Sequence, residues 1–378
     1  MKVSLTDICD FQGGTQPPKD EWIDQPAQGY VRMLQIRDFT QSDKNYIEYV
    51  KDTGKLKTCI EDDILIGRYG ASIGKILTGL AGAYNVAIVK TIPDEKVVGK
   101  KYLYWYLNSQ YFQRFISNVG SRAAQAGFNK NDLCAAQIPL VDKERQEEIC
   151  EVLEKANKLI SLRKQQLAKL DELVKARFVE MFGDPIRNEK GWNTYTLAEM
   201  CDGIGDGLHG TPEYDENGEY PFINGNNLIS GIIQINPSTK KVNKKTYEKH
   251  YIKISQNAIL LSINGTLGRI AFYNSEQVML GKSACYCNLR DEVNRIFVYN
   301  IMKTDAFARY LEDNATKSTI KNVGLKAIRE YRLIMPPIPL QNRFSSFVER
   351  VDQQKQTVQQ SLEKLELIKK ALMQEYFG

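Results

Sequence analysis

The chain has 378 residues, of which 42% are hydrophobic and 26% are charged, so its length suggests two domains with apolar cores of their own. Its formal net charge of +5 at pH 7 is too small to indicate a partner by itself. No run comes near the roughly 18 consecutive apolar residues of a membrane span. The start, MKVSLTDICDFQGG, lacks the charged and apolar regions of a secretory signal. These features argue against membrane contact and predict a cytoplasmic protein.

The first predicted domain covers residues 1–141. Short β-branched runs at 30–36, 64–66 and 86–89, broken by Gly, Pro and Asn, predict strands. A helical segment is predicted at 102–119. This order of elements predicts a mixed α/β domain.

A helical spacer is predicted at 142–183, and a helix of this length spans about 60 Å. Apolar and long side chains recur there at alternating spacings of four and three residues, which is typical of a coiled-coil seam. The predicted seam residues are Ile149, Leu153, Ala156, Ile160, Arg163, Leu167, Leu170, Val174, Arg177 and Met181. The two arginines can reach out of the seam on their apolar stems.

The rest of the chain repeats this plan, with a second domain at 184–340 and a second helical spacer at 341–378. LAKLDELVKARFVEMFG (167–183) and LEKLELIKKALMQEYFG (362–378) are identical at eight of seventeen positions, at an offset of 195 residues. DDILIGRYGASIGKI (62–76) also matches QNAILLSINGTLGRI (256–270). The sequence is therefore a tandem duplication, which decides the architecture.

The second copy has a predicted strand at 259–263, a helical segment at 296–313 and a seam of its own. The seam residues are Phe344, Val348, Val351, Lys355, Val358, Leu362, Leu365, Lys369, Leu372 and Tyr376. Because a long helix gains its stability mainly by packing an apolar face, we predict that the two helices pair. The predicted fold is α+β, with two similar mixed α/β domains joined by two long helices in an antiparallel coiled coil with pseudo-two-fold symmetry. The alternative is two independent surface helices, each docked on its own domain.

The sequence contains no catalytic, metal or cofactor motif. The run GASIGK at 70–75 is one residue short of a phosphate-binding loop and lacks the Ser or Thr that must follow. There is no Asp/Asn-Pro-Pro-aromatic step of an amino-methyltransferase. The seven cysteines are scattered, and with only His209 and His250 no zinc site can be completed. We therefore predict reduced cysteines, no metal, no cofactor and no catalytic activity.

These features resemble those of the specificity subunits of type I restriction–modification systems. The resemblance rests on IPLVDKERQ (138–146) leading into the first long helix, MFGDP (181–185) at its end and the restart GW (191–192). The second copy repeats it as PPIPLQN (336–342) and ends at FG (377–378).

The resemblance implies that each domain is a target-recognition domain, similar to those of adenine-N6 DNA methyltransferases, and reads one half of a split site on double-stranded DNA. It implies that the helices set the gap between the half-sites and dock two methyltransferase (modification) subunits, with restriction (motor–nuclease) subunits joining the complex. It also implies that this subunit is not catalytic. Because the two copies differ most at polar loop residues, we expect an asymmetric bipartite site.

Candidate DNA contacts are polar residues on glycine-rich loops, where backbone can approach phosphate closely. Arg pairs with guanine, and Asn or Gln with adenine, in the major groove. In the first domain the candidates are Gly14, Thr15, Arg37, Arg68, Tyr69, Ser72, Lys75, Asn85, Arg122 and Gln125. In the second they are His209, Thr211, Asn224, Asn226, Asn227, Asn264, Thr266, Arg269, Lys282, Ser283, Lys317, Lys321 and Asn322. The structural alternative is that some of these loops are plain turns.

Two other functions fit the same sequence. One is a stand-alone DNA-binding regulator that uses both domains, and the other is a scaffold whose coiled coil and domains bind proteins. A neighbouring reading frame for an adenine methyltransferase would favour the specificity subunit over both.

Overall fold

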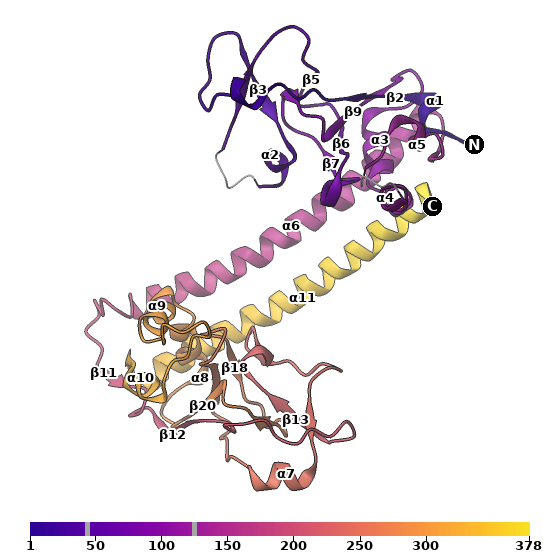
Figure 1. The fold of residues 1–378 in the computed structure, drawn as a ribbon. Coiled ribbons are helices and arrows are strands. Elements are labelled where there is room, and N and C mark those ends of the chain that lie inside the picture. The colour runs from indigo at the N-terminus through magenta and orange to yellow at the C-terminus, as the bar shows by residue number, and fades with distance from the viewer. Residues whose placement is uncertain (42–45, 123–126) are drawn as a thin grey trace. The chain divides into compact units, whose positions relative to one another are not determined.

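The computed structural model describes residues 1–41, 46–122 and 127–378 (Figure 1). Its contacts divide the chain into two compact units: unit 1 comprises Met1–Gln165 and Gln359–Gly378, and unit 2 comprises Gln166–Val358. Each unit contains one globular domain and a part of each long helix, α6 (Lys143–Phe182) and α11 (Ile338–Phe377). No helix in the described part of the chain is both long enough and apolar enough to cross a membrane.

The domain of unit 1 is built from short strands and helices. They are β1 (Lys2–Ser4), α1 (Leu5–Ile8), β2 (Cys9–Gly13), η1 (Lys19–Glu21), β3 (Tyr30–Leu34), α2 (Ile36–Thr40), β4 (Tyr49–Lys51), β5 (Thr58–Cys59), β6 (Leu65–Gly67), η2 (Gly70–Ser72), β7 (Ile76–Leu77), β8 (Gly82–Tyr84), β9 (Ile88–Pro93), α3 (Lys100–Leu107), α4 (Gln110–Arg122), α5 (Lys130–Leu133) and β10 (Gln137–Pro139).

Two four-stranded sheets organise this domain. The first has the order β2-β9-β6-β7 and is antiparallel throughout. The second has the order β4-β3-β8-β5, in which β3 and β8 are parallel. The strands predicted at 30–36, 64–66 and 86–89 overlap β3, β6 and β9, although the chain turns into α2 at Ile36.

The domain of unit 2 follows a similar order of sheet strands and closing helices, although its short elements differ. Its elements are β11 (Thr194–Thr196), β12 (Cys201–Asp206), β13 (Tyr220–Ile223), η3 (Gly225–Asn227), β14 (Leu228–Ile229), β15 (Ile232–Ile233), β16 (Lys241–Val242), α7 (Lys244–Lys249), β17 (Ala258–Ser262), β18 (Ile270–Phe272), β19 (Met279–Leu280), β20 (Ala284–Leu289), α8 (Arg295–Met302), α9 (Asp305–Asp313), α10 (Leu325–Glu330) and β21 (Arg332–Ile334).

The sheets of unit 2 correspond to those of unit 1. The order β12-β20-β17-β18 is antiparallel, and β16-β13-β19 pairs β13 with β19 in parallel. Asn85 N donates to Leu34 O at 3.1 Å in unit 1, and Gly281 N donates to Ile223 O at 2.8 Å in unit 2. The predicted duplication of a mixed helix-and-sheet domain is confirmed.

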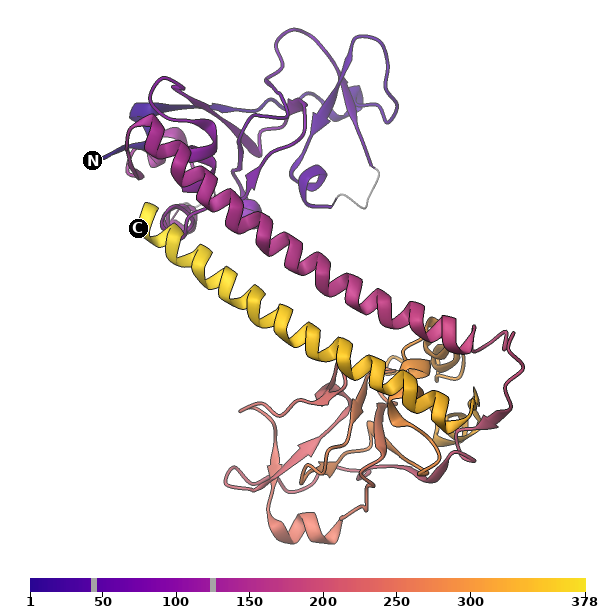
Figure 2. The same ribbon diagram turned by 180° about the vertical axis from the view of Figure 1, so that it is seen from behind.

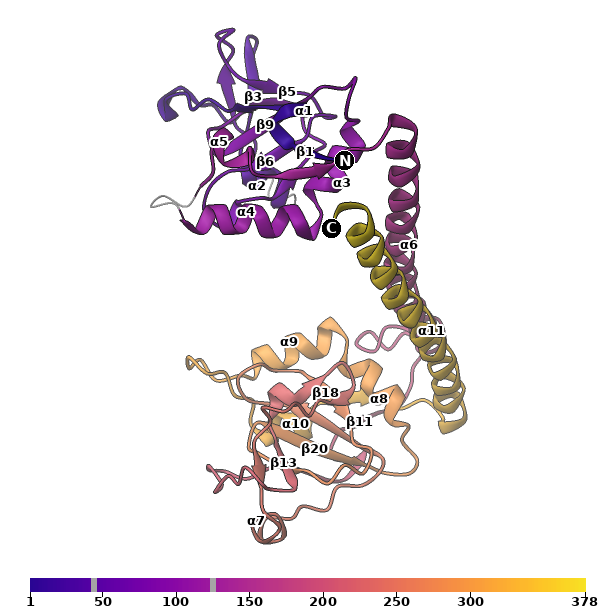
Figure 3. The same cartoon turned by 90° about the vertical axis from the view of Figure 1, so that its right-hand side faces the viewer.

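Each unit has a continuous apolar core that runs from its sheet through its helices to the long helices, with α3 beside α6 in unit 1 and α8 beside α11 in unit 2 (Figure 3). In unit 1 the core includes Ile66, Tyr106, Leu153 and Phe377. In unit 2 it includes Ile259, Phe297, Phe182 and Phe344. All seven cysteines are free, and all but Cys134 are buried.

The predicted seam joins α6 to α11 within each unit. Every predicted seam residue is buried or half-buried. Lys369 Nζ donates to Asn157 Oδ1 at 2.7 Å in unit 1, and Lys355 Nζ donates to Asp171 Oδ1 at 2.7 Å in unit 2. In both units the helices run antiparallel and side by side (Figure 2). The helices therefore pair with each other, and the alternative of two independent surface helices is wrong.

Two helical segments that were predicted as continuous are each divided. The segment 102–119 forms α3 and α4, and the segment 296–313 forms α8 and α9. The hydroxyl oxygens of Ser109 and Thr304 accept hydrogen bonds from the backbone three residues further on, at 3.2 and 3.4 Å. A capping side chain therefore starts a new helix at the same place in both copies.

A buried glutamine anchors the start of each long helix. Gln146 and Gln341 are 2% and 0% exposed, and their side-chain oxygens accept from Gly99 N at 2.9 Å and Asn294 N at 3.0 Å. The second helix begins at Ile338, before the predicted boundary at 341, because the first turn of a helix tolerates proline at 339.

Candidate nucleic-acid interface

Most of the predicted DNA-contacting residues that the structure describes lie on loops or short helical turns between the strands of each unit. Those whose side chains are described are all partly or fully exposed. Arg122 is the last residue of α4, and its side chain is not among those described. Gln125 lies outside the described residues.

A close backbone contact fixes the loop after β2. A Cβ at Gly14 would lie 2.1 Å from the carbonyl oxygen of Asn85, so this position requires glycine. Thr15 N donates to Tyr84 O at 3.0 Å. The structure therefore brings together three residues that the sequence analysis selected separately: Gly14, Thr15 and Asn85.

The same contact recurs in unit 2 at Gly207, which the sequence analysis missed. A Cβ there would lie 2.1 Å from the carbonyl oxygen of Leu280. A β-bulge between Cys201 and Gly203 adds one residue to β12, so the two glycines do not align at a constant offset. Correcting the repeat alignment for one inserted residue would have found it.

The loop after Gly207 carries two predicted contacts, His209 and Thr211, and both are exposed. The ring of His209 lies 2.7 Å from Asp206 Oδ2. Lys282 N donates to Leu208 O at 3.0 Å, which places Lys282 beside this loop.

A short helical turn follows the central strand of the second sheet in both units. Gln35 N donates to Asp38 Oδ2 at 2.8 Å, and Asn224 N donates to Asn227 Oδ1 at 3.0 Å. The Asn227 amide also donates to the backbone at 3.0 Å. Asn227 is therefore engaged in closing the turn, which is the structural alternative stated above.

Arg37 is held by Glu48, a carboxylate that the sequence analysis missed. Glu48 is 5% exposed and accepts from Lys19, from Arg37 and from Gln35 Nε2, the last at 2.7 Å. Burial would raise the pKa of Glu48, but the hydrogen bond and charge of Lys19 and the charge of Arg37 outweigh it, so the pKa lies below its usual value. Its cationic partners lie 29 and 11 residues away, so no local pattern indicates it.

Unit 2 has Lys240 in place of Glu48. The backbone carbonyls of Glu48 and Lys240 accept from equivalent residues of β3 and β13, both at 2.8 Å. Asn226 stands at the position of Arg37 in the turn that follows. The two domains therefore present different chemistry at the same place, an Arg with a carboxylate in one and an Asn with a lysine in the other.

The loop between β6 and β7 presents Arg68, Tyr69, Ser72 and Lys75 in unit 1. The Arg68 guanidinium lies 5.0 Å from the centre of the Tyr69 ring, and its Nε donates to Phe128 O at 2.8 Å. Gly13 lies against the same guanidinium, at 3.6 Å from an ideal Cβ position. Arg68 is therefore held beside the Gly14 loop.

The equivalent loop between β17 and β18 presents Asn264, Thr266 and Arg269 in unit 2. Asn264 Nδ2 donates to Asn322 Oδ1 at 3.2 Å, and an Arg269 nitrogen donates to Asn226 O at 3.2 Å. These bonds join the hairpin to the turn after β13 and to the segment that contains Asn322.

Ser283 connects this surface to the centre of the sheet. Its hydroxyl donates to Asn224 Oδ1 at 2.7 Å and accepts from Gly225 N at 2.9 Å. Lys321 forms an ion pair with Glu312. Lys317 is exposed in the same loop as Lys321. In unit 2, hydrogen bonds thus link candidates on the turn after β13, the β17–β18 loop and the segments that contain Ser283 and Asn322.

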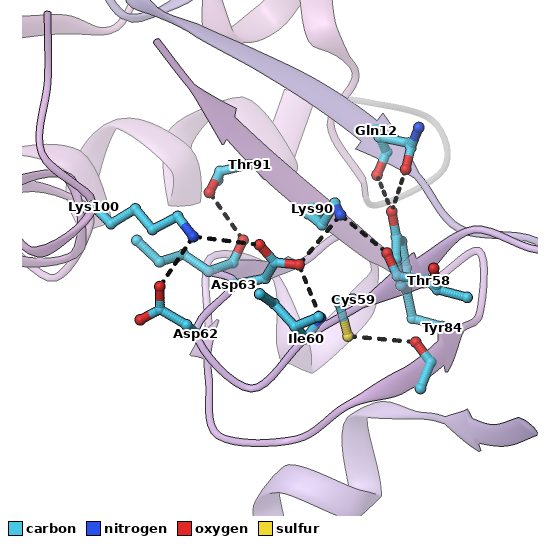
Figure 4. Close-up of polar contacts among 12 residues, drawn as sticks. Gln12, Thr58, Cys59, Ile60, Asp62, Asp63, Tyr84, Lys90, Thr91 and Lys100 are labelled. Atoms are coloured by element: carbon cyan, nitrogen blue, oxygen red, sulfur yellow. Dashed lines mark hydrogen bonds and ion pairs between the residues drawn. The ribbon is translucent and has the colours of Figure 1, made fainter. Parts of the chain in front are cut away.

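Two groups of polar contacts join the strands and loops of unit 1, one between Tyr84 and Gln12 and one around Asp63 (Figure 4). The hydroxyl of Tyr84 donates to Gln12 Oε1 at 3.0 Å, and burial raises the pKa of this tyrosine, so it remains a donor. Lys90 Nζ lies 3.2 Å from Asp63 Oδ2, and Lys100 continues the network. The Tyr84–Gln12 bond joins β8 to β2, and the Gly14 loop starts at the end of β2.

The fold and these surfaces define a duplicated protein with two similar domains, each built onto paired long helices and each presenting polar loops. The sequence matches the family described as Type I restriction modification DNA specificity domain over residues 1–172 and 189–367. The chain belongs to this family, and recognition of DNA is its function.

Similar proteins cover nearly the whole chain. The Type I restriction enzyme MjaIX specificity subunit of Methanocaldococcus jannaschii is 21% identical over 417 residues, which covers 98% of this chain and 90% of that protein. The S subunit of a type I restriction–modification system from M. genitalium has a TM-score of 0.57 at 17% identity, covering 100% of this chain and 96% of that one. A chain from a structure addressing complex assembly and conformational transition of the type I R-M system has a TM-score of 0.63 at 15% identity, covering 100% and 97%. At these identities the structures show a shared fold.

Proposed function

We propose that this chain is the non-catalytic specificity subunit of a type I restriction–modification enzyme and reads an asymmetric bipartite site on double-stranded DNA. Residues 1–141 and 184–340 act as two target-recognition domains, and 142–183 and 341–378 as spacers. The observation that carries this proposal is the exchange of Arg37 and Glu48 for Asn226 and Lys240 at equivalent positions. Because Arg favours guanine and Asn favours adenine, the domains suit different half-sites.

The long helices dock two methyltransferase (modification) subunits, and restriction (motor–nuclease) subunits join them in the cytoplasm. Leu173 of unit 2 and Ile368 of unit 1 occupy equivalent helix positions and are 47% and 52% exposed. Val152, Leu159 and Leu162 extend the exposed apolar surface along α6 in unit 1. Exposed apolar surface rimmed by polar side chains is typical of protein interfaces, and these two related surfaces support two copies of one partner.

Methylation mapping tests this function. The chain is expressed with a partner adenine methyltransferase, and methylated adenines are mapped across the host genome with and without the gene. We expect a split, non-palindromic motif whose methylation requires the gene. Methylation that is independent of the gene, a palindromic motif, or methyl transfer by the purified chain alone would contradict the proposal.

A further inference from the structure

A cavity of about 480 Å³ opens in unit 1 between α3, the start of α4 and the two long helices. Aromatic rings of Tyr104, Trp105 and Tyr111 line one side of it. Lysines of α6 and α11 line the other, namely Lys164, Lys369 and Lys370. A cavity of this volume suits a small organic molecule.

The Lys369 ammonium lines this cavity and forms no ion pair with the described residues, although Glu366, which also lines the cavity, attracts it. Its contacts are Asn157 Oδ1 at 2.7 Å and the Trp105 ring, whose centre lies 5.2 Å away. Burial, and then the charge of Lys164, lower the pKa of Lys369. Lys164 itself is paired with Glu366 at 3.0 Å. None of the ion pairs found among the described residues includes Lys369, so an anion in the cavity would compensate a half-buried charge.

The equivalent place in unit 2 keeps two of these groups, since Tyr299 corresponds to Tyr104 and Lys175 to Lys370, but it lacks three others. At the constant offset of 195 residues, Val174 replaces Lys369, Asn300 replaces Trp105 and Ala306 replaces Tyr111. The capping hydroxyls before α4 and α9 and the buried glutamines of α6 and α11 follow the same offset, so the correspondence is structural. Lys369, Trp105 and Tyr111 line the cavity in unit 1 only, which favours a ligand specific to unit 1.

We propose that this cavity binds a small aromatic anion of the size of a nucleoside monophosphate. Its anionic group lies at Lys369 and Lys370, where charge-assisted hydrogen bonds are available. Its ring lies against Tyr104 and Tyr111, since offset or edge contacts between aromatic rings are favourable. This site is separate from the DNA-reading loops and does not depend on the proposed function.

Isothermal titration of the full chain tests the site with three probes: adenosine monophosphate, adenosine and inorganic phosphate. We expect the nucleotide to bind more tightly than either fragment, because only it carries both recognised groups. Lys369→Met keeps the apolar stem and removes the charge, and it should weaken nucleotide binding about tenfold or more. Lys364→Met is the matched control, because Lys364 is exposed on the same helix and does not line the cavity.

The fluorescence of Trp105 gives a second readout, since the Lys369 ammonium lies over its ring. Nucleotide should change this emission in the parent chain, and Trp105→Phe should remove that part of the response. If Lys369→Met fails to melt cooperatively, Lys370→Met at an exposed position replaces it. Absence of nucleotide binding, binding unchanged by either lysine variant, or phosphate binding as tight as nucleotide binding would overturn the proposal.

Discussion

Glu48 shows how one residue can prepare a recognition loop. Its carboxylate accepts hydrogen bonds from side chains of η1 and of the turn after β3, so it fixes Arg37 before any ligand binds. An arginine whose position is set in advance loses less conformational freedom on binding. The buried carboxylate thus links the packing of the domain to the placement of a base-reading candidate.

Glu48→Gln keeps the size of this side chain and removes the charge that Lys19 and Arg37 face. Their side chains are 64% and 40% exposed, so solvent screens the loss, and we expect about 1–2 kcal/mol at neutral pH rather than the value for a fully buried pair. Because the pKa of Glu48 is lowered in the folded state, its contribution is complete above its unfolded pKa of about 4.3 and is lost as the pH falls through the folded value. Urea unfolding of both proteins at pH 7 and pH 3 measures this. The difference in the free energy of unfolding between the two proteins should be smaller at pH 3 than at pH 7. A larger difference at pH 3 would refute the lowered pKa of Glu48.

At the scale of the helices, substitutions of two leucines of α11 can distinguish the buried seam from the exposed face. Leu362 is 6% exposed and Leu367 is 66% exposed. Leu362→Asp loses the burial of a leucine, about 1.5–3 kcal/mol, and places a charge against α6, so we expect a loss of at least about 3 kcal/mol. Leu367→Asp should change the free energy of unfolding by less than about 0.5 kcal/mol. Urea denaturation followed by circular dichroism measures both, and equal losses would show that the seam is misassigned.

The docking surfaces can be tested one at a time, because Leu173 and Ile368 lie in different units. Each is exposed, so Leu173→Asp and Ile368→Asp should leave the subunit folded while placing a charge in an apolar contact. We expect each single variant to retain one methyltransferase subunit and the double variant to retain none. Native mass spectrometry of the co-expressed complex gives the stoichiometry directly. If the double variant retained two methyltransferase subunits, the docking surface would have to lie elsewhere on the chain.

The long helices could be predicted from sequence because their pattern is local and repeats. The seam positions of α6 and α11 follow spacings of four and three, and every one of them is buried or half-buried. The division of the shorter helices at Ser109 and Thr304 escaped the prediction because a single capping bond overrides the apolar period.

The loops, unlike the long helices, were predictable only in part, because contacts with distant segments hold them in place. Glycine-rich runs marked the Gly14 and Asn264 loops, but a one-residue bulge in β12 hid Gly207. Glu48 escaped because its cationic partners lie 29 and 11 residues away, and such pairing is set by sheet topology. Local patterns identify exposed loops, whereas the groups that hold them come from distant segments.

In the whole molecule, the two copies agree where they build the core and differ where they meet solvent. Gln146 and Gln341 start the long helices with the same backbone bond, and Phe182 and Phe377 fill equivalent core positions. At the turn after the central strand, Arg37 and the buried Glu48 of unit 1 are replaced by Asn226 and Lys240 in unit 2. A duplicated scaffold with divergent loops can recognise two different sequences without altering its fold.

A graft between the units tests whether each domain reads its own half-site. Asn226→Arg with Lys240→Glu gives unit 2 the pair found in unit 1, while the cores and the helices stay unchanged. Because sites without shared partners act independently, the second half-site should gain preference for guanine where it preferred adenine, with the first half-site and the number of intervening base pairs unaltered. Lys240→Glu alone is the control, since it reverses a charge near DNA and should weaken binding without redirecting base choice. Mapping methylated adenines in cells that carry the parent, the control or the graft shows which bases each half-site contains and how many base pairs separate them. A change in the first half-site or in the gap would mean that the domains do not read their half-sites separately. An unchanged second half-site would mean that Asn226 does not contact the bases.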